Sequence, residues 1–373
     1  MNIIKFDKTE LTAALQPVLS VVERRNSLPI LLNVLIKFEG NHATFTTSDV
    51  EIQISSTILK ERNHKEDFEI TVSARKLYEI SKSLSEAIPI SLSLEQEKLI
   101  VTQKGSRFSL QTIKANEFPL IDPGETNTVE LTLKSTDIKQ LLDSVAFSMA
   151  VQDVRYYLNG LFLKIDGKDL IAVTTDGHRL CFNKMSVKAP VEYNGAISCI
   201  IPRKAVIEIQ KIINSEKNIE IKFSIYQNFL RVSFPGKVLI TKLIEGNYPD
   251  YQKVIPQDSK NKVVFSKDEL LEKLNRLSIL TSDKYRGIRI MLSGEKVLMK
   301  SNNADQEEAA EELFTEEGSG ELDIGFNVTY LIEALNNIKT DKIGFSFNDS
   351  QSSAVITDSE NKYFKYIVMP MRL

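Results

Sequence analysis

The chain has 373 residues, of which 42% are hydrophobic and 26% are charged, and its formal net charge is −3. This length predicts two or three domains, each large enough to bury a core. The negative balance excludes a chain that is basic throughout, although a locally basic face can still attract a polyanion. The two cysteines, Cys181 and Cys199, are too few for a disulfide framework, so we expect buried thiols in a reducing compartment.

The sequence carries no signal for export or membrane insertion. Its N-terminal segment, MNIIKFDKTE, lacks the apolar core of a signal peptide. No apolar run approaches the roughly 18 residues that span a bilayer. We therefore expect a cytoplasmic protein with no membrane partner.

Residues 1–125 predict a helix, a hairpin, a second helix and further strands. The apolar stripe of the first helix is Leu11, Leu15, Val18, Leu19 and Val22. Pro17 lies inside it and predicts a kink or a late start. The next segment, VLIKFEGNHATFTTSD, turns at Gly40, because glycine tolerates the positive φ of two-residue turns. The second helix is SARKLYEISKSL, and the copy ends at EFPLI.

Residues 126–253 repeat this order. The stripe of the first helix is Ile138, Leu141, Leu142, Val145 and Met149. The hairpin segment LFLKIDGKDLIAVTTD turns at Gly167, the second helix is PRKAVIEIQKII, and the copy ends at NYPDY.

Residues 254–373 show the order a third time. Ser266 and Glu269 have the spacing of a capping box at the start of the first helix. The hairpin segment IRIMLSGEKVLMKSNN turns at Gly294, the second helix is NVTYLIEALNNI, and the copy ends at VMPMR.

The three hairpin glycines are evenly spaced, 127 residues apart (40 to 167 and 167 to 294). A unit of this size is too long for a solenoid repeat of roughly 20–50 residues. We predict the α+β class, with three tandem domains of two helices against antiparallel sheets and all helices on one face. The expected domains are residues 1–125, 126–253 and 254–373.

The stretch VTTDGHRLC contains an acid/base candidate, Asp176 with His178. The position of Asp176 is filled by Asp49 and Asn303 in the other copies, and neither is followed by a histidine two residues later. A catalytic pair also needs a nucleophile and an orienting group, and no such motif is present. We therefore interpret the polar triplet as shared architecture, the segment GHRL as an addition of the middle copy, and the protein as a non-enzyme.

No phosphate-binding loop and no metal-ligand spacing is present, so we expect no cofactor. The acidic run DQEEAAEE, residues 305–312, lacks the alternation of carboxylates with turns that cation sites use. A solvated or partner-facing strand is the preferred interpretation of this run.

The exposed helical positions are rich in lysine and arginine. They are Arg75, Lys76, Lys82, Arg203, Lys204, Lys211, Lys267, Lys273, Arg276 and Lys339, with Arg24 and Arg25 in a preceding loop. A solvated helix face explains them equally well on composition alone, but their recurrence in three copies favours a phosphate-facing surface. In QDVRYYLNG the tyrosines either contact a DNA backbone or serve the core and an edge. The candidates for DNA contact are Arg25, Arg75, Gln152, Tyr156, Tyr157, Arg203 and Lys204.

The chain resembles the family of bacterial DNA polymerase III beta subunits, the replicative sliding clamps. The resemblance rests on the ordered motifs QDVRYYLNG, TTDGHRL, IPRKAV, YPDYQKVIP, GFNVTYL and VMPMRL, and it runs from LPILLN to the C-terminus. It implies a homodimeric ring around double-stranded DNA, with helices lining the hole, that tethers the polymerase without catalysis. It also implies that the clamp loader, polymerases, mismatch-repair proteins and DNA ligase dock short linear peptides between the second and third domains.

The resemblance also assigns residues to the peptide site and to the dimer contact. The peptide site would comprise Arg155, Leu158, Thr175, Gly177, His178, Arg179, Leu180, Pro249, Val254, Asn327, Tyr330, Ser353, Ile367, Met369, Pro370, Met371 and Arg372. The dimer contact would join Phe108 and Leu110 to Ile279 and Leu280, with Lys76, Lys98 and Arg107 facing Asp305, Glu307, Glu308 and Glu311. Two alternatives from other classes are an interaction scaffold without DNA binding and a hydrolase that uses Asp176 and His178, and neither accounts for three copies.

Overall fold

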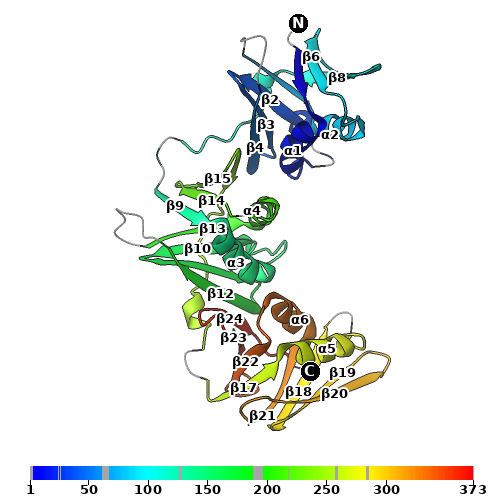
Figure 1. The fold of residues 1–373 in the computed structure, drawn as a ribbon. Coiled ribbons are helices and arrows are strands. Elements are labelled where there is room, and N and C mark those ends of the chain that lie inside the picture. Colours follow the sequence, from blue (N-terminus) through cyan, green and yellow to red (C-terminus); the bar gives the residue numbers. More distant parts are fainter. Residues whose placement is uncertain are drawn as a thin grey trace. The chain divides into compact units, whose positions relative to one another are not determined.

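The structure is a computed structural model that describes residues 3–23, 25, 27–60, 67–124, 126, 128–187, 196–216, 218–256, 259–282 and 285–372. Arg24, one of the basic loop positions, and Leu373, the end of the last motif, lie outside these residues. The chain forms two compact units, Met1–Thr136 with Ile207–Leu243 and Asp137–Val206 with Ile244–Leu373, which we call unit 1 and unit 2 (Figure 1). None of the helices in the described part has the length and apolar character needed to cross a membrane.

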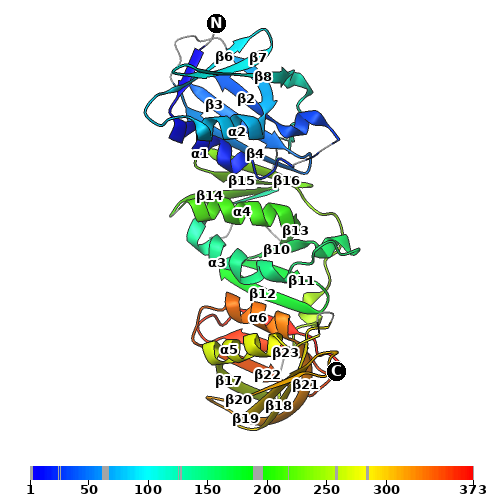
Figure 2. The same cartoon turned by 90° about the vertical axis from the view of Figure 1, so that its right-hand side faces the viewer.

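Unit 1 contains one twelve-stranded sheet in the order β1-β6-β7-β8-β5-β2-β3-β4-β16-β15-β14-β9. The strands are β1 (Ile3–Phe6), β2 (Asn33–Glu39), β3 (His42–Ser48), β4 (Ile52–Leu59), β5 (Phe68–Ser73), β6 (Ile90–Glu95), β7 (Lys98–Gln103), β8 (Ser106–Ile113), β9 (Val129–Lys134), β14 (Glu220–Ile225), β15 (Phe229–Phe234) and β16 (Lys237–Lys242). Helices α1 (Lys8–Val18) and α2 (Ala74–Ser83) pack side by side, and α1 also packs on β3 and β4 (Figure 2).

Unit 2 contains an eight-stranded sheet, β13-β10-β11-β12-β24-β23-β22-β17, and a four-stranded sheet, β20-β19-β18-β21. The strands are β10 (Gly160–Asp166), β11 (Asp169–Thr175), β12 (Arg179–Ser186), β13 (Ala196–Pro202), β17 (Asn261–Ser266), β18 (Gly287–Gly294), β19 (Lys296–Asn302), β20 (Glu308–Phe314), β21 (Gly320–Asn327), β22 (Lys342–Phe347), β23 (Ala354–Asp358) and β24 (Lys365–Val368). Helices α5 (Lys267–Ser278) and α6 (Val328–Asn337) pack against each other and on strands of both sheets. The chain passes from one unit into the other within α3 (Ser135–Val145), within α4 (Arg203–Ser215) and again after Leu243.

The three predicted hairpins are confirmed. In each, two residues connect the strands, because Glu39 pairs with His42, Asp166 with Asp169 and Ser293 with Lys296. The first loop residue is the predicted glycine, with φ of +52° at Gly40, +59° at Gly167 and +65° at Gly294. The left-handed conformation that two-residue hairpins need explains glycine at this place.

The predicted apolar stripes are buried except for the half-buried Leu19, and one detail of the first helix is wrong. Every stripe residue of the middle copy, from Ile138 to Met149, has 3% exposure or less. The first helix begins at Lys8, so Pro17 causes no late start. The helix instead ends at Val18, one residue after the proline, where few hydrogen bonds remain to be lost. The helix α5 is capped as expected, since the Ser266 side chain accepts from the Glu269 N–H at 3.5 Å.

The sheets continue across the boundaries expected between repeats. Strand β4 pairs with β16, and Gln53 lies opposite Ile240. Strand β12 pairs with β24, and Leu180 lies opposite Ile367. Both members of the first pair are 127 positions before those of the second (53 to 180 and 240 to 367), so the two pairings are equivalent. We call them the β4–β16 seam, in unit 1, and the β12–β24 seam, in unit 2.

Candidate functional site

The turn between β11 and β12 is built by its own polar side chains. The Asp176 Oδ1 atom accepts hydrogen bonds from the backbone N–H groups of His178 at 2.9 Å and Arg179 at 3.1 Å. The Thr175 hydroxyl accepts from the Gly177 N–H at 3.0 Å and donates to the Arg179 carbonyl at 2.5 Å. Asp176 therefore organises the turn, and it meets His178 through the main chain and not through the imidazole.

The same construction recurs at the other two copies, which confirms that the polar triplet is shared architecture. The Asp49 Oδ1 atom accepts from the N–H groups of Glu51 and Ile52, and the Asn303 Oδ1 atom accepts from those of Asp305 and Glu307. The next-to-last residue of β3, β11 and β19 has a hydroxyl that donates to the last turn of the first helix of its repeat: Thr47 to the carbonyl of Val18, Thr174 to that of Val145 and Ser301 to that of Leu277. The hydroxyl ties each turn to its helix.

Arg155 covers the middle turn. Its guanidinium donates to the Asp176 carbonyl at 3.1 Å and to the two oxygens of the Asp153 carboxylate at 3.0 and 2.9 Å. These hydrogen bonds lower the pKa of Asp153 to about 2. A Cβ atom on Gly177 would lie 2.7 Å from the Arg155 Nη2 atom, and Gly177 has φ of +89°. The backbone conformation therefore favours glycine at this position, and a side chain here would displace the Arg155 guanidinium.

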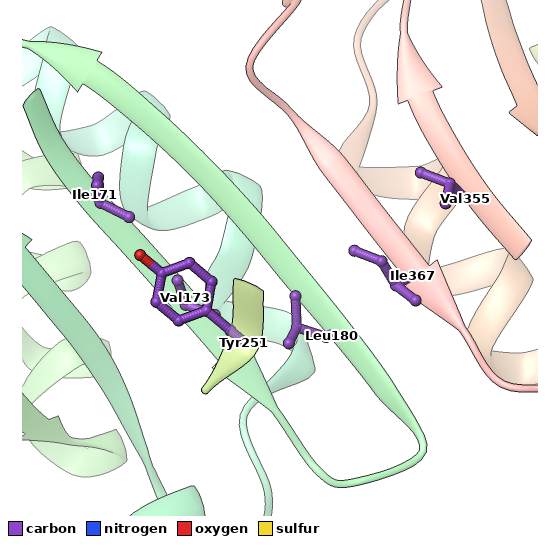
Figure 3. Packing of buried hydrophobic residues seen from close by; sticks show 6 residues of the cluster. All are labelled: Ile171, Val173, Leu180, Tyr251, Val355 and Ile367. Atoms are coloured by element: carbon purple, nitrogen blue, oxygen red, sulfur yellow. The ribbon is translucent and has the colours of Figure 1, made fainter. Parts of the chain in front are cut away.

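An apolar cluster lies on one face of the β12–β24 seam. It consists of Ile171, Val173, Leu180, Tyr251, Val355 and Ile367, all with 8% exposure or less (Figure 3). Phe162, Phe182, Tyr248 and Ile255 pack against it, and the Phe162 and Tyr248 rings stack at 4.9 Å. Tyr251 belongs to the short 3-10 helix η5 (Tyr251–Lys253), so the C-terminal end of the second repeat lies on the cluster.

The margin of the apolar cluster is exposed. Met369 is 46% exposed and Val254 is 41% exposed, and Pro249 and His178 are exposed as well. Met369 and Val254 therefore leave apolar surface in water at this margin.

Arg179 lies on the opposite face of β12 from Leu180. Its guanidinium donates to Asp176 at 3.0 Å, to the carboxylate of Glu333 on α6 and to the Phe147 carbonyl at 3.2 Å. The Tyr330 ring covers it at 4.4 Å. Side chains of consecutive strand residues point to opposite faces, so Arg179 and Tyr330 support the turn from the helix side and do not line the apolar cluster.

The C-terminal segment is fixed by two backbone hydrogen bonds. The Met369 N–H donates to the His178 carbonyl at 3.0 Å, and the Met371 N–H donates to the Gly325 carbonyl at 2.7 Å. Pro370 lies between these two bonds, and Arg372 is exposed. This segment therefore connects the middle turn to strand β21.

The remaining predicted peptide-site residues have structural contacts. Leu158 is buried, with 1% exposure. Asn327 caps helix α6, because its side chain accepts from the Thr329 N–H at 2.9 Å. Ser353 is half-buried just before β23. Ile171, Val173, Val355 and Tyr251 were not predicted to belong to the site, although Ile171 and Val173 have the two-residue alternation of one strand face.

The predicted DNA-contacting residues divide between the units. In unit 1, Arg25 and Arg75 are exposed, and Arg75 donates to the Val22 carbonyl at 2.6 Å. In unit 2, Arg203 makes the equivalent bond to the Met149 carbonyl at 3.1 Å. These contacts hold the guanidinium groups beside the end of the preceding helix.

The loop before β10 has a fixed conformation and presents two tyrosines. Asn159 exchanges two hydrogen bonds with the backbone of Asp153, at 2.9 and 2.8 Å. Tyr156 is 58% exposed, and its ring meets that of Tyr157 edge-on at 5.8 Å. Exposed Gln152, with φ of +54°, and half-buried Lys204 complete the predicted set.

Strands β20 and β8 each have an edge on which strand pairing is absent or incomplete in the described part of the chain. Strand β20 ends the four-stranded sheet, and β8 meets β5 only at Thr112 and Ile113. Phe108 and Leu110 lie on β8, while Ile279, 76% exposed, and Leu280 follow α5. The acidic run contributes Glu308 to β20, and Glu307 is bonded to Asn303. Glu311 pairs within the chain with Arg276, at 2.6 and 3.0 Å.

Within the described residues, no group of three or more His, Cys, Asp or Glu side chains could hold a metal ion. Both cysteines are buried free thiols, as expected, and burial raises the pKa of Cys199 to about 12. A thiol with so high a pKa is a poor nucleophile at neutral pH.

Three protein-family models match the chain in succession. They are the N-terminal domain of the DNA polymerase III beta subunit at residues 2–122, its central domain at residues 132–250 and its C-terminal domain at residues 252–372.

The relatives are beta sliding clamps. The chain is 39% identical to the beta sliding clamp of Pseudomonas aeruginosa over 96% of both chains, and 35% identical to that of Escherichia coli over 98% of this chain and 99% of the relative. Among solved structures, the DNA polymerase III subunit beta of Pseudomonas aeruginosa superposes with a TM-score of 0.95 at 38% identity, and a sliding clamp of Bartonella birtlesii bound to griselimycin does so with a TM-score of 0.94 at 30% identity, each over the full length of both chains.

Proposed function

The chain belongs to the DNA polymerase III beta subunit family, the bacterial sliding clamps, and we propose that two copies close into a ring that slides on double-stranded DNA. The ring makes and breaks no covalent bond. It keeps the replicative polymerase at the primer end by raising its local concentration. This role places the protein in the bacterial cytoplasm.

The observation that carries the ring proposal is the equivalence of the two seams. In each seam, the strand that follows one of the three glycine hairpins pairs with the last strand of the next repeat: β4 with β16 and β12 with β24. By the same rule β20 of the third repeat lacks a partner, and β8, the last strand of the first repeat, has an open edge. Two copies satisfy both edges at once, which closes the assembly by a two-fold axis.

The apolar contact is expected to stabilise this junction more than its ion pairs do. Phe108 and Leu110 would meet Ile279 and Leu280, and Lys76 would face Glu307 and Glu308. Exposed ion pairs contribute only about 0–1 kcal/mol each. Glu311 is a weaker candidate for an ion pair across the dimer contact than the sequence indicates, because its carboxylate already pairs with Arg276.

The contacts to DNA would come from Arg25, Arg75, Arg203 and Lys204, with Gln152, Tyr156 and Tyr157 beside them. Phosphate contacts are blind to base sequence and weaken with salt, which suits a ring that must slide.

The margin of the apolar cluster on the β12–β24 seam would receive short linear peptides of the clamp loader, DNA polymerases, mismatch-repair proteins and DNA ligase. His178, Pro249, Val254 and Met369 form the exposed margin, and methionine adapts to differently shaped apolar anchors.

Retention on circular DNA tests the ring. After loading by a bacterial clamp loader, the protein should stay on a closed circle at high salt and leave once the circle is linearised. The variant that disrupts the proposed dimer contact is Ile279→Asp, because Ile279 is 76% exposed and its replacement leaves the core intact. This variant should lose retention, and its solution mass should fall from about twice 42.2 kDa to that of one chain. Equal release of the unaltered protein from circles and linear DNA would show that no ring forms.

A further inference from the structure

Two lysines share the sheet face that carries the apolar cluster. Leu180, Ile367, Val355, Ser346 and Lys262 lie directly opposite one another on five successive strands, β12, β24, β23, β22 and β17. Directly opposed residues of antiparallel strands project to the same face. Lys262 therefore lies in the row of the cluster, two strands or about 10 Å beyond Val355.

The second lysine is Lys365, two residues before Ile367 on β24. Residues two apart on a strand share a face and lie about 7 Å from each other. Lys365 is opposite Phe182 on one side and Thr357 on the other, and it is half-buried. It therefore borders the apolar cluster along a second edge.

The sheet surface between the two lysines is formed by a glycine and by small polar side chains. Thr357 is opposite Gly344, and a Cβ atom at Gly344 would lie 2.5 Å from the Thr357 Oγ1 atom and 3.6 Å from the Lys262 Cε atom. The Lys262 stem thus lies close to a position without a side chain. The half-buried Ser346 adds a hydroxyl to this strip, which we call the lysine strip: Lys262, Gly344, Ser346, Thr357 and Lys365.

The two lysines differ from their neighbours in having no carboxylate. On the same sheet, Lys184 pairs with Asp169 at 2.6 Å, and Lys164 pairs with Asp166 at 2.6 Å. Glu316 and Glu317, which lie beside β17, both pair with Lys342. Within the residues that the structure describes, neither Lys262 nor Lys365 has an ion-pair partner, so the lysine strip carries uncompensated positive charge.

We propose that the lysine strip selects partner peptides with an aspartate or glutamate about two or three residues from their apolar anchor. The inference rests on the proposed docking of peptides at the apolar cluster. A chain extended across the sheet advances about 3.3 Å per residue, so a carboxylate at this distance from the anchor reaches the strip. The lysines are exposed or half-buried, so the carboxylate should improve affinity about fivefold, and salt should weaken this gain.

Fluorescence anisotropy with labelled peptides tests the proposal on the full chain. Each probe is a short peptide with a Leu-Phe anchor, and glutamate replaces glutamine two or three residues from the anchor on either side. The variant is Lys262→Gln with Lys365→Gln. The control, Lys168→Gln with Lys300→Gln, removes equal charge from a hairpin turn and from the four-stranded sheet.

The unaltered chain should bind at least one glutamate peptide about fivefold more tightly than its glutamine counterpart. The double variant should lose this preference and keep its affinity for the glutamine peptide, and the control should retain the preference. Equal binding of glutamate and glutamine peptides by the unaltered chain, or a preference that persists in the double variant, would overturn the lysine strip and leave the apolar docking intact. Failure of every peptide to bind would overturn both.

Discussion

The β4–β16 seam and the β12–β24 seam follow one plan but present different surfaces. In the first, the side-chain oxygen of Gln53 accepts from the Ile121 N–H at 2.8 Å, so the C-terminal end of the first repeat bonds to the seam. In the second, Leu180 occupies the equivalent position and packs in the apolar cluster beside an exposed margin. One register position, polar or apolar, thus separates a seam that bonds to the end of its own repeat from a seam that has an apolar cluster with an exposed margin.

The turns above the two seams differ at two further positions. Ile52, with 2% exposure, stands where the middle repeat has Arg179. Val50 stands where it has Gly177, and both residues have positive φ, of +70° and +89°. The middle turn therefore contains the buried guanidinium of Arg179, which bonds to α6, and a glycine that leaves room for Arg155. The first turn contains a buried isoleucine and a strained valine instead.

The largest expected effect comes from giving the middle turn the residue of the first. Arg179→Ile should lower the free energy of unfolding by about 3 kcal/mol, because Asp176, Glu333 and the Phe147 carbonyl lose a buried donor. Urea unfolding followed by circular dichroism measures the loss. The control is Arg289→Ile, which breaks an exposed pair with Asp323 and should cost less than about 1 kcal/mol. Similar losses in the two variants would contradict the assigned role of Arg179.

The next largest effects are expected from exchanging Gln53 and Leu180, the residues that distinguish the two seams. Leu180→Gln should cost about 2–3 kcal/mol, because it buries an amide in the apolar cluster, and peptide affinity should fall about tenfold or more. Gln53→Leu should cost about 1–2 kcal/mol, because the Ile121 N–H loses its acceptor, and peptide affinity should not change. Anisotropy titrations and urea unfolding of both variants measure these changes, and a loss of peptide binding in Gln53→Leu would show that the seams are not independent.

A smaller effect is expected from relieving the first turn. A β-branched residue at positive φ is strained, so Val50→Gly should stabilise the chain by about 0.5 kcal/mol despite the entropy cost of glycine. The reverse change, Gly177→Val, should destabilise it by about 1–2 kcal/mol, because it adds strain and displaces Arg155. Thermal unfolding would detect both, and a stabilising Gly177→Val would refute this account of the two turns.

The smallest effect concerns Ser148, near the end of the 3-10 helix η3 (Ala146–Ser148) that follows α3. Its hydroxyl is buried and makes no hydrogen bond in the described part of the chain, whereas the equivalent residue of the first repeat, 127 positions earlier, is the buried Val21. Ser148→Ala should therefore stabilise the chain by a few tenths to about 1 kcal/mol. A clear loss in differential scanning calorimetry would indicate that the hydroxyl has a bonding role.

The sequence alone determined the repeat, the hairpin glycines and the polar turns, because each depends on neighbours a few residues away. Positive φ calls for Gly40, Gly167 and Gly294, and local hydrogen bonds call for Asp49, Asp176 and Asn303. The resemblance to the clamp family added the candidate residues of the peptide site.

Only the tertiary structure decided which of those residues lie together. The pairing of β12 with β24 joins Leu180 to Ile367 and adds Tyr251 and Val355 to them, although these residues are far apart in the chain. Alternation along β12 places Arg179 on the opposite face, against Glu333. The pairings of β24, β23, β22 and β17 place Lys365 beside the apolar cluster and Lys262 two strands beyond it. Strand register sets which side chains share a face, and hydrogen bonds between distant segments set the register, so local sequence patterns cannot specify it.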